Sequence, residues 1–170
     1  MVFTHANGGA TAMGAALEAA ADDNVVGILA FEAAGAHVYE DEPLARGEWS
    51  RGAPTENRLS EQSIPTGLCS LQTAEEKSQL VTLVDVRMAF LYSDRLTEAD
   101  SLNVIACAAE QARESGIEAI GIHMPDHPGG EGTGHFAMSE TGNGELAENI
   151  VIPALAWLQG EDLPSGFTTR

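Results

Sequence analysis

The hydrophobic residues of this chain gather in short continuous runs that are separated by polar or helix-forming stretches. Three such runs span Val25 to Phe31, Val86 to Tyr92 and Ile117 to Ile122. Runs of this length, bounded by polar residues, are typical of strands that are buried on both faces of a parallel sheet. A shorter run at Met1 to Phe3 enters a turn rich in small residues, and it predicts one further strand at the beginning of the chain.

Helix-forming sequences lie between these runs and after the last of them. They span Thr11 to Ala21, about Glu98 to Ser115 and about Glu145 to Gln159. Gly116 is suited to end the second helix, because glycine readily adopts the left-handed conformation found at helix C-termini. Pro153 is expected to kink the third helix, because proline removes a backbone hydrogen bond.

This alternation of strands and helices predicts an α/β fold with a mostly parallel sheet, right-handed crossovers and helices on both faces. We expect a single domain over residues 1–160 and a tail over residues 161–170. Periodicity is lost from Ala33 to about Glu76, where Pro, Gly, Ser and charged residues dominate. A long loop is therefore expected there, with residues 36–76 forming a cap-like insertion.

The charge balance narrows the classes of function. The chain has 26 acidic and 8 basic residues, which gives a net charge of −18. Nucleic acids and anionic membranes are bound by basic surfaces, so neither is an expected partner. No stretch is long and apolar enough to span a bilayer, and Met1 leads into a strand without a basic leader. A cytoplasmic location is expected if Met1 is the first residue, and the compartment is otherwise open.

The first turn has the pattern of a strand–turn–helix with one residue at its apex, a context in which enzymes place a nucleophile. Ala6 occupies the apex, and Thr4 and Gly8 stand two positions to either side. Small residues are needed at those two places because the strand and helix backbones nearly touch. The methyl group of Ala6 cannot attack a carbonyl, so the nucleophile is missing. The alternative is that Ala6 is simply a small residue in a tight turn.

Polar residues that follow the other strands are the further candidates for a site, because ligands bind at the carboxyl ends of parallel strands. Glu32 follows the second strand, Asp94 follows the third, and His135 lies in a glycine-flanked loop after the fourth. The alternative for Glu32 is a helix-capping or solvated carboxylate, and the alternative for His135 is an ordinary exposed imidazole. His5, beside the first turn, is expected to pack or to hydrogen-bond.

One histidine-rich loop contains several residues of the types that bind zinc. Residue types that bind zinc occur there four times within thirteen residues, at His123, Asp126, His127 and His135. Only His123 and His127 have the spacing of neighbours on a helix, and Pro125 and Pro128 disfavour a helix in this loop. We therefore expect no metal site.

Three segments resemble the α/β-hydrolase superfamily. The sequence THANGG at residues 4–9 is similar to its T-H-S-x-G-G elbow. The apolar strand that runs into Phe31 and Glu32 resembles esterases whose triad acid is a glutamate after the sixth strand. The sequence GTGHFAM at residues 132–138 resembles their G-N-G-H-x-M-M segment, which carries the triad histidine. The order of nucleophile position, acid and histidine along the chain is that of this fold.

The resemblance implies a partial α/β-hydrolase fold whose sheet starts at the nucleophile-elbow strand, related to bacterial and fungal carboxylic-ester hydrolases. Ala6 would hold the nucleophile position, Glu32 would be the triad acid and His135 the general base. The backbone N–H of Asn7 would be an oxyanion donor, and Asp94 is the alternative acid. The implied ligand is a small-molecule ester or carboxylic acid, and no cofactor is implied.

The missing nucleophile implies that the chain is inactive or strongly impaired as an ester hydrolase. Loss of the nucleophile costs on the order of 10⁶ in kcat in one serine protease. A non-catalytic ligand-binding or interaction module and an incomplete fragment of a hydrolase are the alternatives. In the family the elbow strand lies in the middle of the sheet, so we expect a second copy or an amino-terminal half to cover its edge here.

Overall fold

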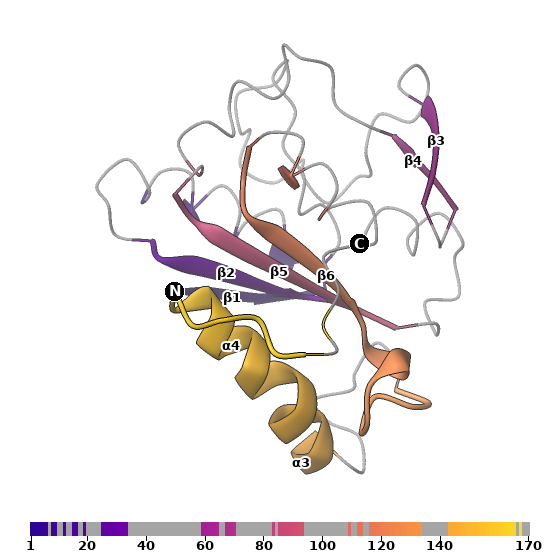
Figure 1. Ribbon diagram of the computed structural model, residues 1–170. Helices are drawn as coiled ribbons and strands as arrows, with labels where there is room; N and C mark the ends of the chain where they lie inside the picture. Colours follow the sequence, from indigo (N-terminus) through magenta and orange to yellow (C-terminus); the bar gives the residue numbers. More distant parts are fainter. Residues whose placement is uncertain are drawn as a thin grey trace.

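Figure 1 shows the computed structural model of the chain. It describes residues 1–6, 8, 9, 12, 15, 16, 19, 25–33, 59–64, 67–70, 83, 85–93, 109, 112, 113, 116–133, 143–165 and 167, and of residues 59–64 and 67–70 it describes the backbone only. The elements formed by these residues are those of an α/β protein.

The centre of the molecule is a four-stranded sheet made from the apolar runs. Its strands are β1 (Val2–His5), β2 (Gly27–Phe31), β5 (Arg87–Tyr92) and β6 (Ala119–His123). All neighbouring strands are parallel, and their spatial order, β1-β2-β5-β6, follows their order in the chain (Figure 1). The predicted strands and the parallel sheet are confirmed, and the strand boundaries differ from the predicted ones by at most two residues.

One face of the sheet is covered by helical residues with small side chains. Ala16, in helical backbone after β1, and Ala109 and Ala112, in helical backbone before β6, are all buried. They share one apolar cluster with strand residues that point to this face, among them Ile28 and Phe90. Small side chains at these positions allow the helices to approach the sheet closely.

The opposite face is covered by the last helical segment, which lies across the sheet in Figure 1. It begins with α3 (Asn143–Leu146), continues as a π-helical stretch, η4 (Ala147–Val151), and ends with α4 (Ile152–Leu158). Its buried side chains pack on the strand residues that point to this side: Leu29, Phe31, Ala89, Leu91, Ile120 and Ile122. Helices therefore cover both faces, as predicted. None of the helices in the described part of the chain combines the length and the apolar character needed to cross a bilayer.

The π-helical stretch lies directly before Pro153 and accommodates it. Proline has no N–H to donate to the carbonyl four residues earlier, and its ring crowds that carbonyl. A π-turn contains one extra residue, so the helix can continue into α4 past the missing hydrogen bond. Pro153 lies directly after this stretch, near the start of α4, and the N–H of Ile152 donates to the carbonyl of Ala147 five residues earlier. The sequence predicts a kink at this proline, and the structure has the π-helical stretch η4 directly before it.

The insertion at residues 36–76 contains a β-hairpin that the sequence pattern does not predict. β3 (Leu59–Ile64) and β4 (Gly67–Ser70) pair antiparallel and form a second, two-stranded sheet (Figure 1). The expectation of a long loop without regular structure is therefore wrong for these residues. The reason is that the β3 sequence does not alternate between apolar and polar residues, whereas backbone pairing in a hairpin does not require such alternation.

Arg87, the first residue of β5, joins the sheet to the end of α4. Its Nε donates to Glu118 at 2.8 Å in an ion pair, and its Nη1 donates to the carbonyl of Trp157 at 2.7 Å. The guanidinium also lies 5.2 Å from the centre of the Trp157 ring. A cation beside the last carbonyls of a helix is favourable because it complements the helix dipole. Arg87 therefore stabilises the docking of α4 on the sheet.

Gly27, the first residue of β2, lies so close to α4 that a larger residue should not fit. A Cβ atom at position 27 would lie 3.0 Å from the Cβ of Leu158. Gly27→Ala should lower the free energy of unfolding by about 1–3 kcal/mol, the usual effect of overpacking. Gly144→Ala is the matched control, because nothing lies within 4 Å of the added methyl group. That helical substitution should raise the free energy of unfolding by about 0.5–1 kcal/mol.

Urea unfolding followed by circular dichroism measures both variants. Equal stability of Gly27→Ala and Gly144→Ala would contradict the close packing of Leu158 on β2.

Candidate functional site

The carboxyl ends of the four strands form one edge of the sheet. The strands end at His5, Phe31, Tyr92 and His123, and the pairing places His5 beside Phe31 and Tyr92 beside His123. The residues that come next in each strand are therefore neighbours along this edge (Figure 1). In parallel sheets this is the edge at which ligands bind.

Ala6 and Glu32 lie on neighbouring strands and share an uncommon backbone conformation. Their φ angles are 50° and 48°, and no other non-glycine residue in the described ranges has a positive φ. The N–H of Ala6 donates to the carbonyl of Phe31 at 3.3 Å, and the N–H of Glu32 donates to the carbonyl of Leu91 at 2.8 Å. The hydrogen-bond ladder thus continues one residue beyond β1 and β2, and it holds both turns next to each other at the carboxyl edge of the sheet. A left-handed backbone costs a non-glycine residue about 1–2 kcal/mol, so the two turns mark a strained site.

The backbone around Ala6 shows the close approach of strand and helix that the residue spacing predicts. A Cβ atom on Gly8 would lie 3.2 Å from Oγ1 of Thr4, which is buried. Gly8 and Gly9 are already helical, and the N–H of Gly9 donates to the carbonyl of Ala6 at 3.1 Å. Small residues at positions 4 and 8 therefore allow the helix to start directly after the strand. Ala6 stands at the apex between them.

Glu32 is fully buried, with 0% of its surface exposed. Burial of a carboxylate costs free energy unless the group is paired or hydrogen-bonded. Buried acids are therefore uncommon, and they are concentrated at functional sites. Ser93, which directly follows β5, is fully buried at the same edge. The sequence reasoning did not single out Ser93. Its only signal was its place as the first polar hydroxyl after a buried strand, next to Asp94.

Three residues assigned to the site, Asn7, Asp94 and His135, lie outside the described residues. The structure therefore places two of the predicted site residues, Ala6 and Glu32, and brings these two together at the edge. His5 packs as expected, since its ring lies 5.9 Å from that of Phe31.

A second group of polar side chains lies at the same edge, after β6. Nδ1 of His123 is 3.1 Å from Oδ2 of Asp126, and the His123 ring lies 5.1 Å from the Tyr92 ring. Asp126 ends a short 3-10 helix, η2 (Met124–Asp126), which directly follows β6. Neighbouring strands are about 4.8 Å apart, so β6 lies about 14 Å from β1. His123 is therefore too far from Ala6 to serve as a base for a nucleophile at that position.

Metal binding at this edge was the other possibility considered from the sequence. Within the part of the chain that the structure describes, no three His, Cys, Asp or Glu side chains are grouped so that they could hold a metal ion. His135, the fourth residue of the set, lies outside that part.

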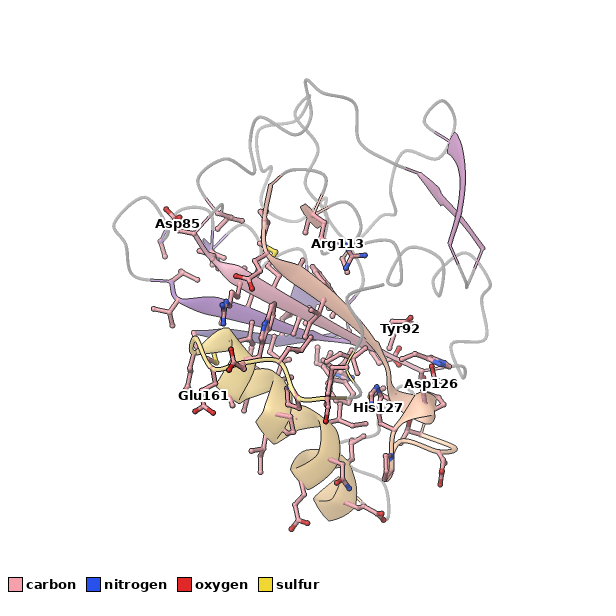
Figure 2. All side chains as sticks on the ribbon, viewed as in Figure 1. Asp85, Tyr92, Arg113, Asp126, His127 and Glu161 are labelled. Carbon is pink, nitrogen blue, oxygen red and sulfur yellow. The ribbon has the colours of Figure 1, made fainter. Side chains whose placement is uncertain are left out.

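A pocket of about 500 Å³ opens at the other edge of the sheet, where the strands begin. Asp85, Arg87 and Glu118 line it together with the end of α4. In Figure 2, Asp85 lies at the opposite end of β5 from Tyr92. This pocket is therefore separate from the candidate site.

In comparisons with protein-family models, curated proteins and solved structures, nothing matches the chain. The likeness to esterases therefore rests on the three sequence segments.

Glycine at position 6 should relieve the left-handed strain. Relief of about 1–2 kcal/mol should outweigh the about 0.5–1 kcal/mol of chain entropy that glycine costs. Ala6→Gly should therefore leave the free energy of unfolding unchanged or raise it by up to about 1 kcal/mol. The control Ala16→Gly, at a buried helical position, should lower it by at least about 1 kcal/mol. Chemical denaturation measures both, and equal destabilisation would show that Ala6 is not strained.

Proposed function

We propose that this chain carries the site of an α/β-hydrolase-type carboxylic-ester hydrolase in which Ala6 has replaced the nucleophile. One observation carries the proposal. Ala6, at the apex of a strand–turn–helix, lies on the strand next to that of the fully buried Glu32, and both residues have a left-handed backbone conformation. Esterases with a Ser-Glu-His triad require an acid near the nucleophile turn. The consecutive parallel order of the four strands is compatible with the carboxyl-terminal half of that fold.

In the proposed site the imidazole of His135 would lie between the Glu32 carboxylate and position 6. Glu32 would fix the tautomer of the ring and stabilise the imidazolium that forms when the ring accepts a proton. The N–H of Asn7 would donate to the oxygen of the substrate as negative charge develops on it. Asp94, after the next strand, is the alternative acid.

The methyl group at position 6 cannot form an acyl-enzyme with an ester. The unaltered chain would then bind a short-chain ester or carboxylic acid without turning it over, and this is the second candidate function, a binding module. Ala6 itself favours this candidate, because the turn is retained without its reactive group. Calorimetry with ethyl butyrate distinguishes the two functions, because a binding module titrates without releasing acid and a hydrolase releases it.

A hydroxyl at position 6 should restore turnover. A nucleophile contributes on the order of 10⁶ to kcat in a serine protease, so recovery of even a small part of that contribution is measurable. Ala6→Ser should hydrolyse p-nitrophenyl acetate at least about 100-fold faster than the unaltered chain. It should also react covalently with a fluorophosphonate probe. Release of p-nitrophenolate and mass spectrometry of the labelled peptide measure these two outcomes.

The matched control is Ala6→Ser combined with Glu32→Gln, because glutamine keeps the shape of glutamate and removes its charge. Loss of the triad acid's charge lowers kcat by about 10⁴ in a serine protease, so the double variant should lose the restored turnover. A folded Ala6→Ser protein that neither hydrolyses the ester nor reacts with the probe would contradict the hydrolase assignment. Equal turnover in both variants would contradict the role of Glu32.

We also propose that another strand covers the outer edge of β1. Among the strands that the structure describes, β1 pairs with β2 alone, and Met1 and Phe3 are 43% and 49% exposed. The sequence of β1 has no lysine, proline or acidic residue of the kind that usually protects an edge strand. The covering strand would come from a second copy or from an amino-terminal half such as the resemblance implies.

Coverage by a second copy predicts a dimer. Dimerisation should increase with salt, because salt screens the repulsion between two chains that each have a net charge of −18. Phe3→Lys should shift the protein toward the monomer. The control Val26→Lys, which changes another exposed apolar residue, should not. Size exclusion with light scattering measures the mass, and a monomer at every salt concentration would rule out a second copy as the covering partner.

A further inference from the structure

The chain reverses direction at the end of α4 because of Gly160. Its φ of 101° is left-handed, its N–H donates to the carbonyl of Trp157 at 3.0 Å, and the N–H of Glu161 donates to the carbonyl of Ala156 at 3.1 Å. These two bonds form a Schellman motif, which satisfies the last carbonyls of the helix. The residues that follow, Glu161 to Ser165 and Phe167, are called the strap here. In Figure 1 the chain leaves α4 and runs back beside it toward the carboxyl edge of the sheet.

The strap is attached at its beginning and packs on the core further along. Nη1 of Arg87 donates to the carbonyl of Glu161 at 3.3 Å. Leu163 and Phe167 are half-buried and pack against the apolar cluster on the α4 side of the sheet. Glu161, Asp162 and Ser165 are exposed. A segment with so few buried contacts belongs to the part of a protein that opens most easily.

At its far end the strap also contacts the turn after β6. The rings of Phe167 and His127 are stacked, with centroids 4.7 Å apart and planes at 24°. Figure 2 shows His127 at the carboxyl edge and Glu161 well away from it, toward the edge where the strands begin. The strap therefore reaches the side of the sheet that carries the candidate site.

The turn that presents His127 is closely constrained. The N–H of His127 donates to the carbonyl of Met124 at 3.0 Å, and the N–H of Gly130 donates to the carbonyl of His127 at 2.9 Å. A Cβ atom on Gly130 would overlap the carbonyl of Met124, so glycine is required there. The backbone of His127 is therefore held by the turn, and the Phe167 ring stacks on its side chain.

Charged groups around His127 come from three elements in the described structure. Asp126 precedes it in the turn, and His123 ends β6. Glu145, at the start of α3 where Gly129 packs, is exposed. The strap's own carboxylates, Glu161 and Asp162, are at its other end and are exposed.

Burial lowers the pKa of His127 below its ordinary value of 6.5, while Asp126 raises it in part and His123 lowers it further. A neutral ring is therefore favoured when the strap is closed, because protonation would place a charge in a half-buried contact. The closed state binds fewer protons than the open state between pH 6.5 and the lowered pKa. Closing is thus most favourable above pH 6.5 and weakens as the pH falls through that range.

We propose that the strap is a pH-dependent latch, in which stacking of Phe167 on neutral His127 holds the strap against the sheet and protonation of His127 releases it. Release removes Leu163 and Phe167 from the apolar cluster on the α4 side and uncovers part of that cluster. The latch depends on the turn after β6 and on the strap alone. It does not depend on the proposed hydrolase function.

Hydrogen exchange measured by mass spectrometry on the full chain tests the latch at pH 7.5 and pH 5.5 at constant ionic strength. After correction for the intrinsic pH dependence of exchange, the opening of the strap peptide should increase at least about twofold at pH 5.5, because the open state binds protons that the closed state disfavours. The peptide that covers β5 should stay protected at both pH values, which shows that the fold is intact.

Two variants separate the latch from a general effect of acid. His127→Phe keeps an aromatic ring and removes the titration, so the strap should stay protected at both pH values. Phe167→Ala removes the stack, so the strap should exchange rapidly at both. The same pH response in the unaltered chain and in His127→Phe would overturn the proposal. If His127→Phe unfolds the protein, as shown by exchange in the β5 peptide, Phe167→Ala is the deciding variant. A pH response of the strap that persists in Phe167→Ala would also overturn the proposal.

Discussion

Main-chain hydrogen bonds that run past the ends of β1 and β2 hold the carboxyl edge of this protein in place. The N–H groups of Ala6 and Glu32 are each bound by a carbonyl of the neighbouring strand, and both residues are kept in the left-handed region. Strain of this kind persists only where the surroundings determine it. Here the surroundings are a sheet that is buried on both faces and a helix that starts directly after the first turn. Main-chain hydrogen bonds therefore determine where the candidate site lies on the sheet edge.

The sheet could be predicted from the sequence because burial on both faces leaves a continuous apolar run. β2 shows this directly, since all five of its residues are buried. Gly116 could also be predicted, and its φ of 85° and its hydrogen bond to the carbonyl of Arg113 confirm the helix end. The hairpin of β3 and β4 could not, because its pairing is a matter of backbone geometry and its residues carry no alternating pattern. Pro153 predicts a kink in the last helix, but the sequence does not predict the π-helical stretch before it.

The geometry of the turn at Ala6 could be predicted from the sequence, and the conformation of Glu32 could not. The spacing of Thr4 and Gly8 around Ala6 predicts the close approach that the structure shows. Glutamate has no preference for the left-handed region, so the conformation of Glu32 follows from its neighbours in the sheet and has no signal in the sequence. The contact of His127 with Phe167 joins residues that are far apart in the chain, and no spacing rule reports such a contact.

The conformation of Ala6 is fixed by main-chain hydrogen bonds, and this has a consequence for which side chains the position can carry. A side chain at that position completes neither of the main-chain hydrogen bonds that hold the turn, because the N–H of Ala6 donates to Phe31 and its carbonyl accepts from Gly9. Exchange of a hydroxymethyl for a methyl group, or the reverse, therefore leaves the scaffold as it was. A turn that is held by its main chain can therefore keep its shape whichever small side chain stands at its apex.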